Sequence, residues 1–244
     1  MDKKSVSVIV PAFNEAGNIE NAIREIIAAV EGQKIQDYEI LIFDDCSVDE
    51  TGKIADKLAS ENKRIRVVHN AKNMGLGYNY KKGIDLAEKD YIIPIHGDNE
   101  IVTDSIGGIL ALAGKADIIV PYTSNPEVRS RFRQFVSRAF TRLMNFLFGL
   151  NMRYYNGHCL VSRELLKTVY NNNFEFTHIA MAEVLIKLIK SGHSFLEVPI
   201  YLRAKKHANA SVFRLKNIIG VNKTIIRLFW EIRFKDRKKY AQTK

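Results

Sequence analysis

The chain has 244 residues, 46% of them hydrophobic, which fits one large α/β domain that buries a substantial core. Its two cysteines exclude a disulfide scaffold, and neither lies in a CxxC pair that would indicate structural zinc. The net charge of +10 is uneven: residues 201–244 hold 13 Lys and Arg against two acids, a net of +11, which leaves −1 elsewhere. A basic end on a neutral body predicts contact with membrane lipid or nucleic acid, unless it is a solvated tail.

The first half of the sequence alternates strand-like and helix-like segments. Strands are expected at 5–10, 38–43, 65–68, 91–95 and 116–120, with helices at 14–30, 49–62, 77–88 and 105–113. This alternation predicts βαβ units and a mostly parallel sheet. Polar clusters follow the first four strands, and in open α/β sheets a ligand lies outside the carboxyl ends of the strands. We therefore expect a nucleotide-binding half that ends near residue 122.

The segment after the fourth strand is the most informative in the chain. The apolar run 91–95 ends abruptly at His96, Asp98 and Glu100. If the chain stays extended there, side chains two residues apart face the same way. The three side chains would then converge on one point; the alternative is an ordinary polar loop.

The second half predicts two amphipathic helices. Residues 129–150 carry an apolar stripe at helical spacing and five arginines, so this helix lies either in the membrane interface or on the core. Residues 215–234 place apolar residues on one side, with Lys, Thr, Arg and Glu on the other. A helix at 176–191 and an edge strand at 194–200, interrupted by Pro199, lie between them. No stretch of about 18 apolar residues predicts a bilayer span, and the short first apolar run does not indicate a signal peptide.

Four motifs resemble glycosyltransferase family 2 in order and spacing. Residues 7–15 (SVIVPAFNE) resemble its opening "vPxyNE", 43–51 (FDDCSVDET) its "vDDgSxDgT" and 70–77 (NAKNMGLG) its "N.gnxGxg" loop. His96-Gly-Asp98 falls where the family carries its Asp-x-Asp metal motif. Less specifically, residues 133–137 with 148–150, and 197–200, resemble the branch that charges dolichyl or polyprenyl phosphates.

The resemblance implies a GT-A fold, which is α/β with a Rossmann-like, mostly parallel sheet flanked by helices, here with C-terminal amphipathic interface helices. It implies inverting transfer of a sugar from a nucleotide-diphosphate sugar to a polyprenyl phosphate, by a cytoplasmic protein bound peripherally to the anionic inner face of the membrane. Residues 1–122 would bind the donor and 123–211 the acceptor, and 212–244 would form a basic amphipathic helix and tail. Nucleic acid is not an expected partner, because an apolar stripe lies beside the basic residues.

The resemblance also assigns site residues. Those implied for substrate binding are Pro11, Phe13, Glu15, Asp44, Asp45, Gly97, Ser137 and Lys206; those for catalysis are Asp98 and Arg133; and those for Mg²⁺ or Mn²⁺ are His96, Asp98 and Glu100. Asp45 would accept a hydrogen bond from the base, with Asp44 beside it. Asp98 and Glu100 would hold the cation on the diphosphate, and Arg133 with Ser137 and Lys206 would hold anionic oxygens of donor or acceptor.

Several positions depart from the family pattern. His96 replaces the first aspartate of the metal motif, so it is either a ligand or a packing residue, since Mg²⁺ prefers oxygen. Residues 154–157 stand where the branch has Asp-Thr-x-Gly, and Val212 where it has lysine. A saccharide acceptor would need a general base such as Glu175 or Glu183, whereas a lipid phosphate is already an anion. A non-catalytic relative that binds nucleotide sugars is the remaining alternative.

Overall fold

The computed structural model describes residues 4–155, 157–169, 179–204 and 215–240. In these ranges the strands are β1 (Ser5–Ala12), β2 (Asp37–Asp44), β3 (Ile65–His69), β4 (Tyr91–Pro94), β5 (Ile118–Thr123), β6 (Leu160–Ser162) and β7 (Phe195–Ile200). The helices are α1 (Ile19–Gly32), α2 (Thr51–Glu61), α3 (Leu76–Leu86), α4 (Thr103–Ala111), α5 (Arg131–Phe148), α6 (Arg163–Val169), α7 (Ala180–Lys190), α8 (Leu215–Trp230) and α9 (Arg237–Tyr240), with a 3-10 turn at Pro126–Val128 and a π-helical turn at Glu231–Lys235.

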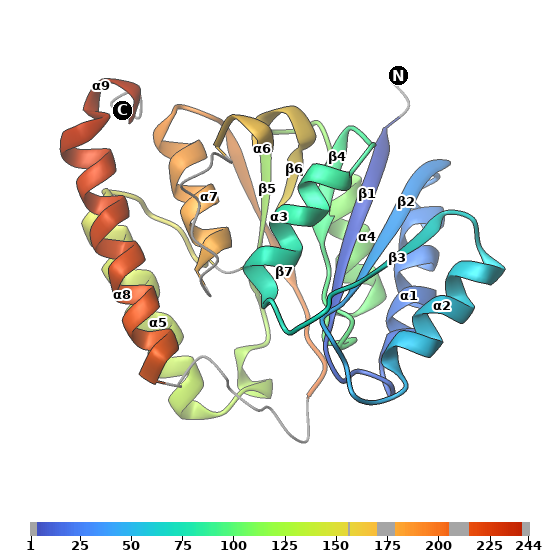
Figure 1. The fold of residues 1–244 in the computed structure, drawn as a ribbon. Helices are drawn as coiled ribbons and strands as arrows, with labels where there is room; N and C mark the ends of the chain where they lie inside the picture. Colours follow the sequence, from blue (N-terminus) through green and yellow to red (C-terminus); the bar gives the residue numbers. More distant parts are fainter. Residues whose placement is uncertain (1–3, 156, 170–178, 205–214, 241–244) are drawn as a thin grey trace.

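The described strands form one sheet in the order β3-β2-β1-β4-β6-β5-β7 (Figure 1). Strands β3, β2, β1 and β4 run parallel, as does β7 beside β5, while β6 is antiparallel to both β4 and β5. The predicted mostly parallel α/β sheet is therefore confirmed, and β7 lies at the edge, as Pro199 indicated. The short antiparallel β6 has no counterpart among the predicted strands.

Alternation along the strands explains the two helical layers. Val6, Val8 and Val10 point into one core, which is closed by α1, α2 and α4, whereas Ile9 points into the other. That second core contains buried residues of α3, α5, α6, α7 and α8. Because both faces of the central strands are covered, β1 and β2 are buried almost throughout, as parallel strands require.

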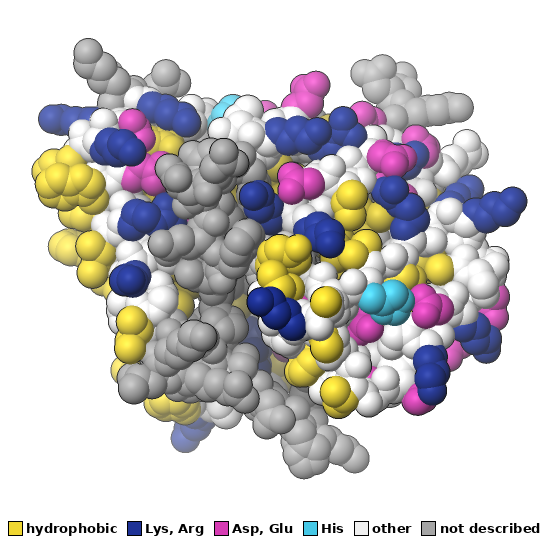
Figure 2. Space-filling view, viewed as in Figure 1, with side chains coloured by type: hydrophobic (Ala, Val, Ile, Leu, Met, Phe, Trp, Pro, Cys, Tyr) yellow, Lys and Arg dark blue, Asp and Glu magenta, His cyan; other side chains and the backbone are white. Residues whose placement is uncertain are grey.

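The helices α5 and α8 pack on the core at few positions and expose much of their apolar surface. Within α5, Met144 and Phe148 are buried. The outer surface of the two helices and the π-helical turn carries exposed large apolar side chains, which are Phe132, Phe135, Leu143, Phe146, Ile219, Ile226, Trp230 and Phe234. Figure 2 shows hydrophobic side chains along the outer side of α8, interspersed with Lys and Arg. No helix in the described ranges is long and apolar enough to cross a bilayer.

A buried ionic cluster holds α8 against α7. The Glu183 side chain is fully buried; its carboxylate accepts a hydrogen bond from Arg227 Nη2 at 2.7 Å, and its Oε1 forms an ion pair with Lys187 Nζ at 2.9 Å. Lys187 Nζ also lies 3.0 Å from Glu231 Oε1. Arg227 and Glu231 thus point into the protein, whereas Ile226 and Trp230 on the same helix face outward. Buried charges need such partners, so the cluster fixes the rotation of α8.

Removing one member of this cluster should destabilise the fold. We expect Lys187→Met to lower the free energy of unfolding by about 3 kcal/mol, because two carboxylates would then share the Arg227 guanidinium in a buried site. The matched control is Lys53→Met, which removes an exposed pair with Glu50 and should cost less than about 1 kcal/mol. Urea unfolding followed by circular dichroism measures both; similar losses would contradict the buried role of the cluster.

Candidate functional site

Four loops meet at the carboxyl edge of the parallel strands. The register brings the ends of β1 and β2 level, because Ala12 pairs with Asp44, while β4 ends earlier, where Pro94 pairs with Ile9, and its loop continues alongside the end of β1. Backbone hydrogen bonds then join the loops directly: Asp45 N to Ala12 O (2.9 Å), Asn70 N to Asp44 O (2.9 Å) and Gly97 N to Pro11 O (3.1 Å). The polar clusters that follow these strands in the sequence are therefore neighbours in space.

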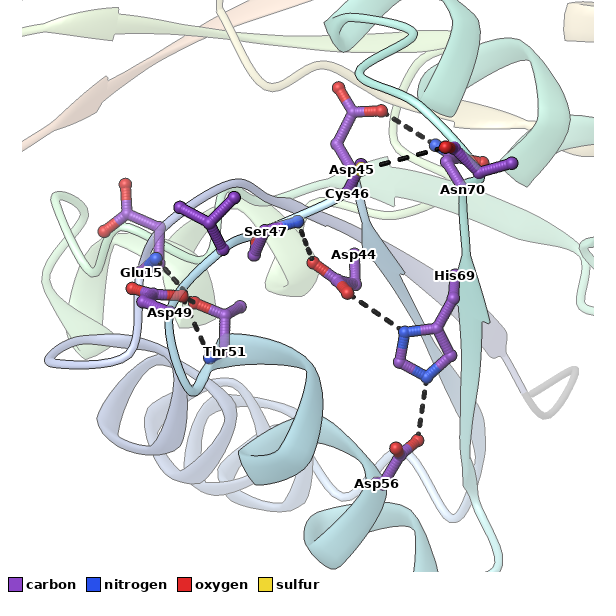
Figure 3. A network of polar contacts seen from close by, with 12 residues as sticks. Glu15, Asp44, Asp45, Cys46, Ser47, Asp49, Thr51, Asp56, His69 and Asn70 are labelled. Atoms are coloured by element: carbon purple, nitrogen blue, oxygen red, sulfur yellow. Dashed lines mark hydrogen bonds and ion pairs between the residues drawn. The ribbon is translucent and has the colours of Figure 1, made fainter.

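The loop after β1 is bound to the loop after β2 by side chains (Figure 3). Backbone N–H groups of Asn14, Glu15 and Ala16 donate to Ser47 Oγ (3.0 Å), Thr51 Oγ1 (2.7 Å) and Asp49 Oδ2 (3.1 Å). Asn14 and Cys46 have positive φ values of 56° and 63°, so the backbone turns sharply within two residues of the end of β1 and of β2. These contacts account for the Asn-Glu and Ser-x-Asp-x-Thr patterns and fix the backbone that carries Phe13 and Glu15.

Asp45 joins the third loop to the first two. Its buried carboxylate accepts hydrogen bonds from Asn70 Nδ2, Met74 N and Gly75 N, each at 2.8 Å. Gly75 has φ +83°, a conformation that favours glycine, and it directly precedes α3. Charge-assisted bonds to backbone N–H groups are among the stronger ones in proteins. Asp45 therefore organises residues 70–75; its contact with a base stays a prediction.

Asp44 lies in a second carboxylate network. Its buried side chain accepts from Ser47 N at 3.1 Å and lies 3.0 Å from His69 Nδ1, while His69 Nε2 lies 3.0 Å from Asp56 Oδ1 (Figure 3). Hydrogen bonds to Asp44 and Asp56 raise the pKa of His69 above its usual value, because both carboxylates favour the imidazolium. Gly52 packs so closely that a Cβ there would lie 2.9 Å from Asp44 Oδ2.

The segment after β4 does not stay extended. Strand β4 ends at Pro94, residues 97–98 form a turn, and Asn99 has φ +51°. Alternation therefore fails, and within the described residues no three His, Cys, Asp or Glu side chains form a group that could hold a metal ion. The expectation that His96, Asp98 and Glu100 converge on one point is wrong, whereas their roles as ligands stay predictions.

His96 packs against a second histidine that the sequence analysis did not single out. The rings of His96 and His158 lie edge to face with centroids 4.5 Å apart, and His158 Nδ1 lies 2.7 Å from Pro94 O. Burial, followed by the neighbouring His96, lowers the pKa of His158 to about 3. His158 is therefore neutral, with Nδ1 donating to the carbonyl and Nε2 carrying a lone pair.

Glu100 forms an ion pair across the site. Its Oε1 accepts from Arg129 Nη2 at 3.1 Å, and Arg129 Nη1 donates to Tyr154 Oη at 3.3 Å. The two charged side chains are only 16–17% exposed. The pKa of Arg129 is raised despite the opposing effect of burial, because Tyr154 and Glu100 favour the cation. The sequence placed Arg129 among the arginines of residues 129–150 and Tyr154 at a departure from the family pattern, but it assigned neither a role in the site, since their partners are distant along the chain.

Arg129 also lines a pocket rich in arginine. This arginine pocket has a volume of about 220 Å³ and its walls are Tyr122, Thr123, Pro126, Arg129, Arg133, Gln134, Ser137, Arg138, Arg153 and Tyr154. The predicted pair Arg133 and Ser137 thus lies in one cavity, one helical turn apart on α5. Four arginines line this small volume, and because among the described residues Glu100 and Glu197 pair with only two of them, Arg129 and Arg153, the pocket has an excess of positive charge that favours an anion.

The remaining predicted residues are placed as follows. Pro11 is buried at the end of β1, Phe13 is exposed beside it, and Gly97 is buried where a Cβ would lie 2.7 Å from Ile19 Cδ1. Lys206 and Glu175 fall outside the described residues. Glu183, considered above as a general base, is fully buried in its ion pairs and has no access to an acceptor.

Comparison with known proteins agrees with this architecture. Residues 7–170 match the family model described as "Glycosyl transferase family 2". Glycosyltransferase AglD of Haloferax volcanii is 27% identical over 241 residues, or 95% of this chain and 38% of that protein. The cholesterol galactosyltransferase of Borreliella burgdorferi is 33% identical over 115 residues, or 47% of this chain and 30% of that protein. The chain thus spans well under half the length of these two relatives.

Solved structures share the fold. Glucosyl-3-phosphoglycerate synthase from Mycobacterium tuberculosis in complex with UDP superposes with a TM-score of 0.68 at 20% identity, covering 93% of this chain and 79% of that one. Mannosyl-3-phosphoglycerate synthase from Rubrobacter xylanophilus gives a TM-score of 0.68 at 18% identity, covering 96% and 75%. At these identities the likeness establishes the GT-A architecture of the sheet and its flanking helices.

Asp45→Asn tests the role of this carboxylate in organising the third loop. The amide offers one acceptor oxygen, so at least one of the N–H groups of Met74 and Gly75 loses its partner. We expect a loss of about 2 kcal/mol in the free energy of unfolding and faster amide exchange across residues 70–75. Asp49→Asn is a control outside this loop, and exchange rates at residues 70–75 that stay unchanged in Asp45→Asn would contradict the assigned role.

The His69 network predicts a pH dependence of stability. Because the folded protein raises the pKa of His69, the contribution is complete below the unfolded value near 6.5 and is lost as pH rises through the folded value. We expect the protein to lose stability as the pH rises above about 6.5, and His69→Gln to flatten this part of the profile. Chemical unfolding at half-unit pH steps measures it; an unchanged slope in the variant would assign the effect elsewhere.

Proposed function

Because the chain belongs to glycosyltransferase family 2, we propose that it transfers a sugar from a nucleotide-diphosphate sugar to a polyprenyl phosphate at the cytoplasmic membrane face. The observation that carries this proposal is the arginine pocket, which lies next to the loop of Asp98 and Glu100 through the Arg129–Glu100 pair. The carboxylates of Asp98 and Glu100 would hold the cation that binds the donor diphosphate. The arginine side chains of the adjoining pocket would bind an anionic acceptor.

The donor would lie at the carboxyl edge of β1, β2 and β4. Phe13 presents an exposed ring and Glu15 a partly exposed carboxylate there, on a backbone held by Ser47, Asp49 and Thr51. Structures of the mycobacterial synthase contain UDP or UDP-glucose at such a fold. UDP-sugars are therefore the first donors to test.

A divalent cation fits the donor set of this site. The mycobacterial synthase has been solved with Mn²⁺ or Mg²⁺ together with UDP. Mg²⁺ is commonly bound by one or two carboxylates, waters and substrate phosphates, so it needs no cage of three protein ligands. The partly exposed Asp98, with Glu100 nearby, supplies oxygen ligands of this kind. Such a cation would neutralise negative charge that develops on the departing diphosphate.

The chemistry of the acceptor follows from the arginine pocket. Arg133 and Ser137, with Arg129 beside them, would bind a phosphate monoester and direct one of its oxygens toward the donor. That oxygen attacks the anomeric carbon, a new C–O bond forms, and the bond to the diphosphate breaks with its electron pair passing to the leaving oxygen. Because the attacking group is already an anion, no proton has to be removed, and attack opposite the leaving group inverts the anomeric centre.

The outer surface of α5 and α8 supports a membrane location. Arg227 on α8 and Glu231 at the start of the π-helical turn point into the protein, while Ile226 and Trp230 on α8 face outward, 70% and 60% exposed. This distribution is the reverse of what water favours and fits a surface that rests on acyl chains. Lys and Arg on the same helices would contact anionic headgroups.

A lipid extraction assay tests the function. The full chain is incubated with labelled UDP-, GDP- or TDP-sugars, Mn²⁺ or Mg²⁺ and a polyprenyl phosphate in detergent, and label in the organic phase is counted. We expect one donor to give lipid-phase label, with Asp98→Asn inactive and Arg133→Gln at least about tenfold lower in kcat/KM for the lipid, as loss of a charged hydrogen bond predicts.

The matched control for Arg133 is Arg131→Gln. Arg131 is an exposed arginine on the same helix that does not line the arginine pocket, so its removal should leave kcat/KM nearly unchanged. Equal losses in the two variants would point to general electrostatic attraction instead of phosphate binding. Label moving to a soluble saccharide and never to lipid would overturn the polyprenyl acceptor.

A further inference from the structure

The Arg129–Glu100 pair connects the two halves of the proposed site. Glu100 lies two residues after Asp98, and its backbone N–H donates to Asp98 Oδ1 at 3.2 Å. Arg129 forms part of the arginine pocket. The ion pair therefore engages both the Glu100 carboxylate, which is proposed to bind the cation, and the Arg129 guanidinium, which is proposed to bind the phosphate.

The backbones on both sides of the pair are fixed, so exchange of partners requires side-chain rotation alone. Arg203 N donates to Glu100 O at 2.8 Å, and the Arg203 guanidinium donates to the carbonyls of Asn99 and Ile101. On the other side, Arg129 N donates to Pro126 O at 3.0 Å, and its carbonyl accepts from Gln134 Nε2 at 2.9 Å. Glu100 and Arg129 can thus change partners without unfolding either loop.

A phosphate bound to Arg129 would compete with Glu100. An arginine binds an oxyanion bidentately either through Nη1 and Nη2 or through Nε and Nη2, and both arrangements include Nη2. Nη2 is the atom that Glu100 holds, whereas Nε is buried and has no hydrogen-bond partner among the described residues. A bidentate phosphate would therefore lie against the Glu100 carboxylate, and the two negative charges would repel each other.

We propose that Arg129 and Glu100 exchange partners when the substrates bind, Arg129 turning to the acceptor phosphate and Glu100 to the divalent cation beside Asp98. Either ligand alone must separate a largely buried ion pair and leaves one charge without its partner. The second ligand supplies the missing partner. Cation and phosphate therefore bind with positive coupling, and the coupling is reciprocal. This inference rests on the proposed function for the identity of the phosphate.

The test measures binding of phenyl phosphate to the full chain by calorimetry, first without metal and then with saturating Mn²⁺ and UDP. Without metal, Glu100→Gln should bind phenyl phosphate at least about fivefold more tightly than the wild type, within the usual range of coupling between sites. Arg129→Gln should bind it more weakly, and adding Glu100→Gln to that variant should change nothing further, because Glu100 acts through Arg129. With Mn²⁺ and UDP, the wild-type affinity should rise several-fold, and that of Glu100→Gln should stay constant.

The matched control is Arg138→Gln. Arg138 lines the same pocket but pairs with Gln134, so this variant should bind phosphate more weakly yet keep the increase caused by Mn²⁺ and UDP. Arg129→Lys, which keeps the charge and loses the bidentate geometry, replaces Arg129→Gln if the latter does not unfold cooperatively. The proposal is overturned if Glu100→Gln binds phosphate no better than the wild type, if the increase persists without Arg129, or if no variant binds phosphate.

The result of the calorimetric binding experiment can be separated from that of the transfer assay, because the binding experiment involves no sugar transfer. Coupling without lipid-phase label would uphold the exchange and reject the polyprenyl acceptor in favour of another phosphate-bearing one. Lipid-phase label without coupling would uphold the proposed function and reject the exchange.

Discussion

Parallel pairing of β1 with both β2 and β4 is the constraint on which the site depends. The pairing brings the ends of β1 and β2 level and places the segment after β4 beside the end of β1, so that all three loops turn sharply at one edge. Asn14, Cys46 and Asn99 all have positive φ values at these turns. Chains that reverse so abruptly leave backbone N–H groups without partners in the sheet, and side-chain oxygens accept them. The carboxylates and hydroxyls at this edge therefore hold the loops in place, in addition to any role in binding a ligand.

A second constraint is that the charged groups around the site are paired with one another or with backbone N–H groups. Asp45 is bound by backbone N–H groups, Asp44 lies beside His69, and Glu100 pairs with Arg129. Because a buried or half-buried charge is costly without a partner, a ligand that enters must replace an existing interaction. Binding at such a site is an exchange of partners, so the affinity for one substrate depends on which others are present.

The sequence predicts the fold of residues 1–122 well because its signals there are local. Hydrophobic runs, turn residues and the polar clusters after strands lie within a few residues of one another, and β1 to β5 with α1 to α4 follow them. The start of α1 was placed too early, at Asn14, since residues 14–16 donate instead to the loop after β2. Strand β6 has three residues and pairs with strands distant in the chain, so periodicity carries no signal for it.

The wrong predictions about the site arose where a rule based on neighbouring residues missed a contact with a residue distant in the sequence. Alternation along residues 96–100 assumed an extended chain, but Asn99 turns into the left-handed region and Glu100 pairs with Arg129. Glu183 appeared to be a free acid, although Lys187 and Arg227 neutralise it in the interior. Arg227 does lie among polar residues of its helix, but they do not all face solvent: Lys223 is exposed, whereas Thr224 is buried and Arg227 pairs with the buried Glu183. Nothing in the spacing of α8 reveals which side faces the core.

The two roles of α5 explain why an apolar surface and a cationic pocket occur together. Arg133 and Ser137 line the arginine pocket, while Phe132, Phe135 and Phe146 project from the same helix into the surroundings. A polyprenyl phosphate, the proposed acceptor, also has an apolar and an anionic part. Its hydrocarbon chain stays in the bilayer, and its phosphate has to reach an anion-binding site on the protein. A helix lying in the interface satisfies both, because its apolar side chains enter the acyl region while its arginines stay at headgroup level. If the proposed acceptor and membrane location hold, the phosphate would need to move only across the width of α5 to enter the pocket, so the energetic cost of extracting it from the membrane would stay small.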